Sequence, residues 1–126
     1  MKTAQDLVAA AKQQIQELSL AKAPDSIQRA SLLIDVREPA EFQQGHLAGA
    51  INIPRGMLEF KMGSSPALES RDQSIVLYCK TSGRSALSAL SLQAMGYINV
   101  SSMAGGYDAW VEAGNPIVKP DLPEFG

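Results

Sequence analysis

Short apolar runs that alternate with helix-like segments are the feature of this 126-residue chain that most limits its fold. Four runs, at residues 32–36, 50–53, 75–78 and 97–100, are each followed by turn or helix signals. The first and third are almost continuously hydrophobic, which is typical of strands covered on both faces. Because strands that alternate with helices form parallel sheets, we predict an α/β fold. We expect about five short strands in a central, mostly parallel sheet, with helices on both faces.

Helices are expected between the runs, over residues 39–44, 57–62, 85–95 and 105–113, and Gly96 is expected to follow the third of them as a C′ glycine. Residues 3–14 carry apolar side chains at helical spacing behind Thr3, a candidate N-cap. They predict an additional, amphipathic N-terminal helix. A short edge strand at 15–18 and a helix from Ser19 to about Ala30 should follow it.

The expected organisation is one domain with an added helix. The N-terminal helix takes residues 1–14, the domain takes residues 15–118, and residues 119–126 form a loosely held tail that contains two prolines.

Composition excludes several classes of function. With 11 Lys and Arg against 13 Asp and Glu, the net charge is −2, so we expect no nucleic-acid partner and no anionic membrane partner. The chain has neither a signal-peptide run nor the stretch of about 18 apolar residues that a membrane span needs, and we expect a cytoplasmic protein. One cysteine and one histidine cannot close a structural zinc site, so we expect no metal and no other cofactor.

The only cysteine, Cys79, closes the third apolar run and precedes a small polar loop and a helix-forming segment. A lone cysteine is more often a small buried hydrophobe. Here, however, it stands at the carboxyl end of a predicted parallel strand, the edge at which α/β sheets bind ligands. Free amides at a helix N-terminus, the helix dipole and the nearby Lys80 and Arg84 all favour an ionised sulfur. We therefore predict that Cys79 is a nucleophile.

The loop after Cys79 has the composition of an anion site. A short loop curled over a sulfur atom would point successive N–H groups inward, and hydroxyl side chains would add donors. The predicted substrate- or anion-binding residues are Lys80, Thr81, Ser82, Gly83 and Arg84.

Two further motifs lie before and after this loop in the sequence. Residues 33–42 read LIDVREPAEF and residues 45–54 read GHLAGAINIP; later, residues 105–110 read GGYDAW, before Gly114-Asn115-Pro116. Together with the Cys79 loop, these segments resemble the rhodanese homology domain over about residues 32–118.

The resemblance implies a sulfurtransferase with a rhodanese-like fold. Cys79 would take a sulfane sulfur from a small anionic donor such as thiosulfate and carry it as a persulfide. It would then pass the sulfur to cyanide or to a thiol, on a small molecule or on a partner protein. The loop amides would hold the negative charge, while Lys80 and Arg84 would attract the donor and retain the departing sulfite.

Two alternatives stay open at this point. Related domains that hydrolyse phosphate esters or reduce arsenate carry a loop that is one residue longer, wide enough for a tetrahedral oxyanion. The Cys-x-x-x-x-Arg spacing here fits a single sulfur atom better. A non-catalytic binding module is the other alternative, and the presence of Cys79 argues against it.

Asp35 and Arg37 follow the first apolar run and should emerge near the loop as supporting residues. An ion pair or helix cap is the favoured role for them, with substrate positioning as the second. For His46 we favour a hydrogen bond that holds a turn over a general base, and for Tyr107 and Trp110 we favour core packing. A further group of apolar residues should pack near the pocket rim: Met57, Leu58, Phe60 and Met62.

Overall fold

The computed structural model describes residues 1–120 of the chain. Its strands are β1 (Gln16–Leu18), β2 (Leu32–Asp35), β3 (Ile51–Asn52), β4 (Ile75–Tyr78) and β5 (Val100–Met103). Its helices are α1 (Ala4–Lys12), α2 (Ala23–Arg29), α3 (Pro39–Gln44), α4 (Leu58–Ser64), α5 (Gly83–Ala94) and α6 (Gly106–Glu112), with short 3-10 helices at Arg55–Met57 and Pro66–Leu68. Residues 121–126 of the predicted tail lie outside the described residues.

All five strands are parallel and lie in the order β1-β5-β4-β2-β3, which confirms the predicted parallel sheet. In this register Asp35 of β2 is level with Tyr78 of β4, and Leu77 is level with Ser102 of β5. The carboxyl ends of three neighbouring strands therefore meet at one edge of the sheet. Cys79 follows the middle one of the three.

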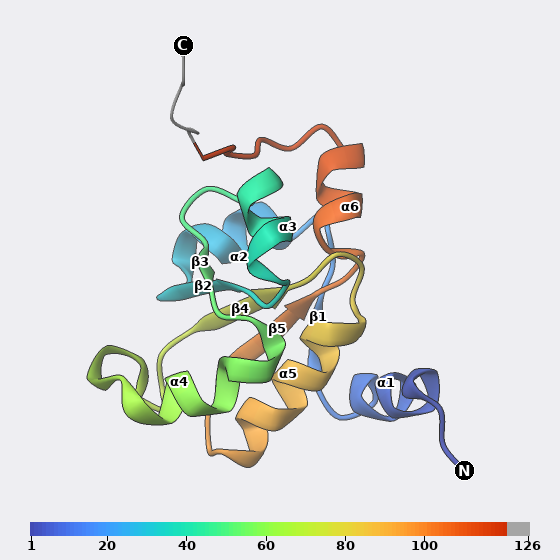
Figure 1. The fold of residues 1–126 in the computed structure, drawn as a ribbon, viewed down its shortest axis with the longest axis vertical. Helices are drawn as coiled ribbons and strands as arrows, with labels where there is room; N and C mark the ends of the chain where they lie inside the picture. Colours follow the sequence, from blue (N-terminus) through green and yellow to red (C-terminus); the bar gives the residue numbers. More distant parts are fainter. Residues whose placement is uncertain (121–126) are drawn as a thin grey trace.

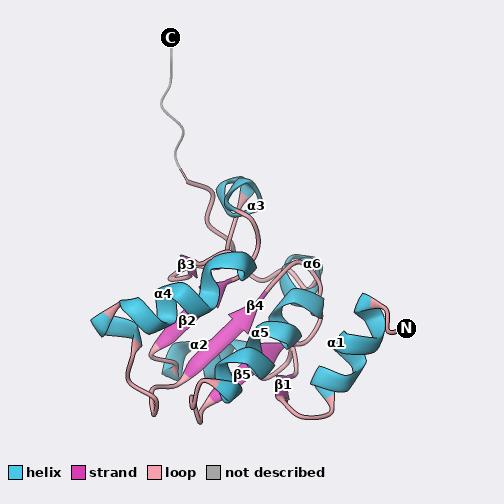
Figure 2. Ribbon diagram, turned by 60° about the horizontal axis from the view of Figure 1, so that its bottom comes forward, coloured by secondary structure: helices cyan, strands magenta, loops and turns pink. Residues whose placement is uncertain are grey.

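Helices cover both faces of the sheet (Figure 2). Successive side chains of a strand point to opposite faces, so Ile75 and Leu77 enter one core while Val76 and Tyr78 enter the other. The first core also contains residues of α4 and α5: Leu58, Met62, Ala89 and Leu92. The second contains Ala23 of α2 and Trp110 of α6. Burial on both faces explains why β2 and β4 read as continuous apolar runs.

The predicted N-terminal helix is confirmed as α1, which packs beside α5 at one end of the molecule (Figure 1). Thr3 caps it, because its Oγ1 accepts from the Asp6 amide at 3.1 Å, and the Thr3 amide in turn donates to Asp6 Oδ2 at 2.9 Å. Ala11 is buried on the packed side, whereas Leu7 is 49% exposed.

The strand predicted at residues 97–100 is wrong, because β5 runs from Val100 to Met103. Gly96, with φ +99°, ends the preceding helix as predicted, and Tyr97 continues into a loop rather than a strand. The Tyr97 hydroxyl donates to Leu68 O at 2.7 Å. Serines at 101 and 102 weaken the apolar pattern of the true strand, which explains the displacement.

Two helix starts also differ from expectation. The helix predicted from Ser19 begins instead at Ala23, and Pro24 lies in its first turn, where a missing N–H removes no hydrogen bond. The helix after Cys79 begins at Gly83, two residues earlier than predicted, so Arg84 lies in its first turn.

Candidate active site

The Cys79 side chain lies between the end of β4 and the start of α5, and the residue is 1% exposed. Its Sγ accepts a hydrogen bond from the Ser85 N–H at 3.4 Å. The Ser85 amide belongs to the first turn of α5, where amides have no partner within the helix. The sulfur therefore takes the position of an N-capping group, at the positive end of the helix dipole.

A short chain of buried hydroxyl groups reaches the sulfur. Ser85 Oγ lies 3.6 Å from Cys79 Sγ, donates to Ser82 O at 3.2 Å and accepts from Ser102 Oγ at 2.8 Å. Because a serine hydroxyl rotates, Ser85 can turn its hydrogen from the carbonyl to an ionised sulfur. Ser85 and Ser102 were not among the predicted site residues. A serine at the carboxyl end of β5 would have been a signal, had the strand been placed correctly.

The N-terminus of α6 holds the backbone of the Cys79 loop. The Tyr107 amide donates to Cys79 O at 2.8 Å and the Asp108 amide donates to Lys80 O at 3.0 Å. In a trans peptide the N–H points opposite to the C=O, so the amides of Lys80 and Thr81 point away from α6. The sulfur packs in the core under α4 and α5, on the face opposite to that of Trp110 in α6.

Gly106 makes this close approach possible. A Cβ atom at this position would lie 2.6 Å from Cys79 O and 2.7 Å from Lys80 O, and it would also overlap Thr81 O. The residue has φ +61°, which side chains disfavour. The second glycine of the GGYDAW segment therefore has a structural reason, since it lets α6 reach the loop.

Both cations predicted to attract the donor have a carboxylate partner. Lys80 Nζ lies 2.7 Å from Asp108 Oδ2 on the surface. Arg84 makes two hydrogen bonds to Glu41, at 2.7 and 3.1 Å. The Arg84 guanidinium lowers the pKa of Glu41 to about 2, and the Glu41 carboxylate in turn raises the pKa of Arg84, to which the nearby Cys79 also contributes. Thr81, Ser82 and Gly83 complete the loop between these two ion pairs.

Asp35 and Arg37 form the ion pair that was favoured for them, and both are buried. Arg37 Nη2 lies 2.8 Å from Asp35 Oδ2 and also donates to Gly45 O at 2.6 Å. Its guanidinium lies 4.2 Å from the centre of the Tyr107 ring. The pair thus joins the end of β2 to the segment before β3 and to α6.

His46 and Trp110 pack as favoured, whereas only half of the apolar rim group does. His46 Nδ1 lies 3.1 Å from Phe42 O, and its ring stacks on the Phe42 ring. Trp110 is 6% exposed and donates from Nε1 to Pro116 O at 2.8 Å. Of the apolar rim group, Leu58 and Met62 are buried whereas Met57 and Phe60 are exposed.

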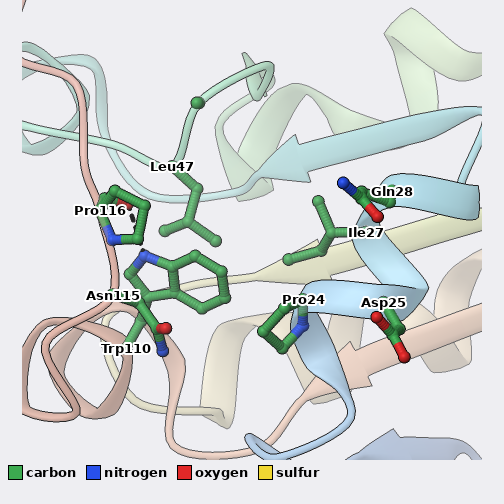
Figure 3. Close-up of a pocket in the computed structure, with 9 residues that line it drawn as sticks. Pro24, Asp25, Ile27, Gln28, Leu47, Trp110, Asn115 and Pro116 are labelled. Atoms are coloured by element: carbon green, nitrogen blue, oxygen red, sulfur yellow. Dashed lines mark hydrogen bonds between the residues drawn. The ribbon is translucent and has the colours of Figure 1, made fainter.

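Two cavities differ in their relation to the loop. One, of about 460 Å³, lies between α2 and Trp110, and no predicted site residue lines it (Figure 3). The other, of about 420 Å³, is lined by Thr81, Ser82 and Gly83 together with α1. Within residues 1–120, no cluster of three or more His, Cys, Asp or Glu side chains is placed to hold a metal ion. No helix in the same range has the length and apolar character needed to cross a bilayer.

Comparison with known proteins places this arrangement in a family. The model of the rhodanese-like domain matches residues 14–113. A sulfurtransferase from Allochromatium vinosum is 36% identical over 90 residues, which cover 71% of this chain and 80% of the relative. The chloroplastic thiosulfate sulfurtransferase 16 of Arabidopsis thaliana is 33% identical over 108 residues, which cover 79% and 89% of the two chains.

A solved structure shares the fold over nearly the whole chain. It is a protein of unknown function from Rhodopseudomonas palustris, described as a possible tyrosine phosphatase, with 30% identity and a TM-score of 0.81. The aligned region covers 94% of this chain and 96% of that one. The family match extends from the edge strand β1 to the end of α6 and includes the Cys79 loop. The chain belongs to the rhodanese-like domain family.

Proposed function

We propose that this protein is a sulfurtransferase that carries a sulfane sulfur as a persulfide on Cys79. The observation that carries the proposal is the hydrogen bond from the Ser85 amide to Cys79 Sγ, which holds the sulfur at the N-terminus of α5. A negative sulfur is stabilised at that position by the free amide and by the helix dipole. Membership of the rhodanese-like family and the sulfurtransferase names of two relatives support the same reaction class.

The proposed reaction has two steps. The Cys79 thiolate attacks the outer sulfur of thiosulfate or a similar donor, the donor's S–S bond breaks, and sulfite leaves with the bonding electron pair. The terminal sulfur of the resulting persulfide is then attacked by cyanide or by a thiolate, which restores the Cys79 thiolate. Neither step needs a cofactor, and no general base is needed once the sulfur is ionised.

The loop residues have proposed roles in holding charge. The amides of Lys80 and Thr81, which point away from α6, would bind an anion above the sulfur, and Ser82, Gly83 and Arg84 would complete the anion-binding loop. Arg84 and Lys80 would draw in the donor and hold sulfite, although Glu41 and Asp108 already offset their charges. Asp35 and Arg37 would act as support, because their ion pair fixes the segment that α6 packs against.

A phosphatase or arsenate reductase is the second candidate, because the solved relative from Rhodopseudomonas palustris is described as a possible tyrosine phosphatase. Two features favour sulfur transfer. Four residues separate Cys79 from Arg84, and Cys79 is 1% exposed. A terminal sulfur atom projects from its donor and reaches a covered thiolate more easily than a phosphorus atom enclosed by four oxygens.

The test is intact mass spectrometry after incubation with thiosulfate. We expect wild type to gain the mass of one sulfur atom, and Cys79→Ser to gain none. The adduct should disappear on addition of cyanide or a thiol. Absence of the adduct in wild type, combined with Cys79-dependent hydrolysis of an aryl phosphate, would replace this proposal with the phosphatase. If Cys79 reacted with neither thiosulfate nor an aryl phosphate, the non-catalytic binding module would be the remaining alternative.

The acceptor is proposed to be cyanide, a small thiol or a cysteine of a partner protein. A free catalytic thiol suits a reducing compartment, so we propose the cytoplasm as its location.

A further inference from the structure

The last residue of α1 contacts the loop that follows Cys79. Lys12 Nζ donates a hydrogen bond to Ser82 Oγ at 2.7 Å, across 70 positions of sequence. The Lys12 side chain is 34% exposed, and its nearest carboxylate, Glu17, lies 4.0 Å away. Helix α1 therefore brings an ammonium group to the predicted anion site.

This contact lies in the wall of the 420 Å³ cavity between α1 and the loop. The helix lines it with Ala4, Gln5, Val8, Ala9 and Lys12, and the loop lines it with Thr81, Ser82 and Gly83. Val8 packs against Gly83, since a Cβ added to that glycine would meet Val8 Cγ2 at 3.6 Å. A small molecule in this cavity would touch the ammonium group and the loop together.

Lys12 differs from the two cations near the loop in what it binds. Lys80 and Arg84 each contact a carboxylate at 2.7 Å, which offsets their charge. Lys12 contacts a neutral hydroxyl, and Glu17 is at the limit of ion-pair distance. Because an ammonium group has hydrogens and no acceptor, Ser82 must accept with its oxygen and keeps its own hydrogen for another partner.

We propose that Lys12 is a positioning residue for an anionic substrate, and that α1 thereby completes the active site. Lys12 orients the Ser82 hydroxyl so that its hydrogen points to an anion in the cavity, and it adds a positive charge that the loop cations do not supply. The inference rests on the proposed function for the identity of the anion, a small sulfur donor such as thiosulfate. The family match begins at residue 14, so Lys12 lies outside the segment that the chain shares with the family model.

Steady-state kinetics with thiosulfate test the proposal. For Lys12→Met we expect KM to rise about fivefold, because the anion loses a partly exposed positive charge and the hydroxyl that this charge orients, while kcat stays within about twofold. Lys12→Arg should restore KM to near the wild-type value. Lys2→Met is the matched control, because it removes the same charge from the exposed start of the same segment and should leave KM unchanged.

A double-mutant cycle tests whether Lys12 acts through Ser82. In the Ser82→Ala background, Lys12→Met should lose more than half of its effect on KM. Full additivity of the two substitutions, or a Lys2→Met effect equal to that of Lys12→Met, would overturn the proposal.

Alkylation of Cys79 gives a readout that does not require sulfur transfer. Iodoacetate is an anion and iodoacetamide is neutral, so the ratio of their rate constants reports the potential at the sulfur. Lys12→Met should lower this ratio about threefold, whereas Lys2→Met and Lys12→Arg should leave it near wild type. If Lys12→Met lowers the ratio of the alkylation rate constants but wild type forms no sulfur adduct with thiosulfate, the sulfurtransferase proposal is wrong and the anion site is supported. An unchanged ratio, or a sulfur that neither reagent reaches, would overturn the anion site itself.

Discussion

The sulfur of Cys79 takes a position that an oxygen usually fills. N-capping side chains are commonly those of Ser, Thr, Asp or Asn, which accept from an amide of the first helical turn. Here Sγ accepts from the Ser85 amide, and the Ser85 hydroxyl lies close enough to add a second donor. The proposed attack on the donor uses the ionised sulfur, which this amide and the helix dipole would stabilise.

Ser85→Ala should slow persulfide formation about tenfold, the effect of losing one hydrogen bond of about 1 to 1.5 kcal/mol to the reacting sulfur. The substitution keeps the backbone amide and removes only the hydroxyl. The measurement is the second-order rate constant for adduct formation with thiosulfate. Ser88→Ala is the control, since Ser88 is also buried in α5 but donates to Arg84 O at 2.7 Å instead. Equal rates for the two variants would show that the Ser85 hydroxyl takes no part.

The ion pair between Glu41 and Arg84 should give stability a dependence on acid pH. The pKa of Glu41 is lowered from 4.5 to about 2, so the folded state favours the charged carboxylate. Its contribution is present above pH 4.5 and is lost as the pH falls towards 2. Glu41→Gln should lower the free energy of unfolding at pH 7 by about 0.5 to 1 kcal/mol, because the pair is partly exposed to solvent.

Urea unfolding at several pH values checks this expectation. The difference between wild type and Glu41→Gln should shrink between pH 4.5 and 2. Glu69→Gln, at an exposed position, removes the same charge and should show little difference at any pH. A gap for Glu41→Gln that stays constant with pH would contradict the ion-pair contribution.

At the scale of elements, two helix N-termini meet at the Cys79 loop. The N-terminus of α5 receives the sulfur, and the N-terminus of α6 binds the loop carbonyls. The loop carbonyls thus have hydrogen-bond partners on the α6 side, and the amides of the same trans peptide groups point to the opposite side. The packing of α6 against the Cys79 loop is sensitive to substitution, because it depends on the absence of a side chain at Gly106.

Gly106→Ala should separate α6 from the loop. The added Cβ meets carbonyl oxygens at 2.6 and 2.7 Å, and the position has φ +61°, so we expect a loss of about 3 kcal/mol in unfolding free energy. The rate of sulfur transfer by Gly106→Ala should also fall. Gly114→Ala separates the two causes, because Gly114 has φ +82° and nothing within 4 Å of its Cβ position. That control should cost only about 1 kcal/mol and keep activity. Equal losses in both variants would mean that the close approach is unimportant.

Element types were predictable from local patterns, and strand ends less so. The apolar runs of β2 and β4 identified the sheet because both faces of those strands are buried. The position of β5 was missed because Ser101 and Ser102 interrupt its apolar pattern, and one of them, Ser102, contacts the site through Ser85. Contacts between distant residues were beyond the sequence alone: Lys12 meets Ser82 across 70 positions, and Arg84 meets Glu41 across 43.

At the scale of the whole molecule, the candidate site lies at the carboxyl edge of the sheet, and α1 borders the loop that follows Cys79. The division into a helix at 1–14 and a domain at 15–118 stays a prediction. In the structure, Lys12 of the first part contacts Ser82 of the second, so the two parts share the cavity beside the loop. A deletion of α1 is therefore expected to affect the site as well as stability.

The central claim is that Cys79 removes and holds the outer sulfur of an anionic donor. Thiosulfate labelled in its outer sulfur tests it most directly, with the bound label located by mass spectrometry of peptides and the released sulfite measured in the same sample. We expect one labelled sulfur per chain, on the peptide that contains Cys79, together with one equivalent of unlabelled sulfite. Label that stays in solution, or that attaches to Cys79→Ser as well as to wild type, would contradict the claim.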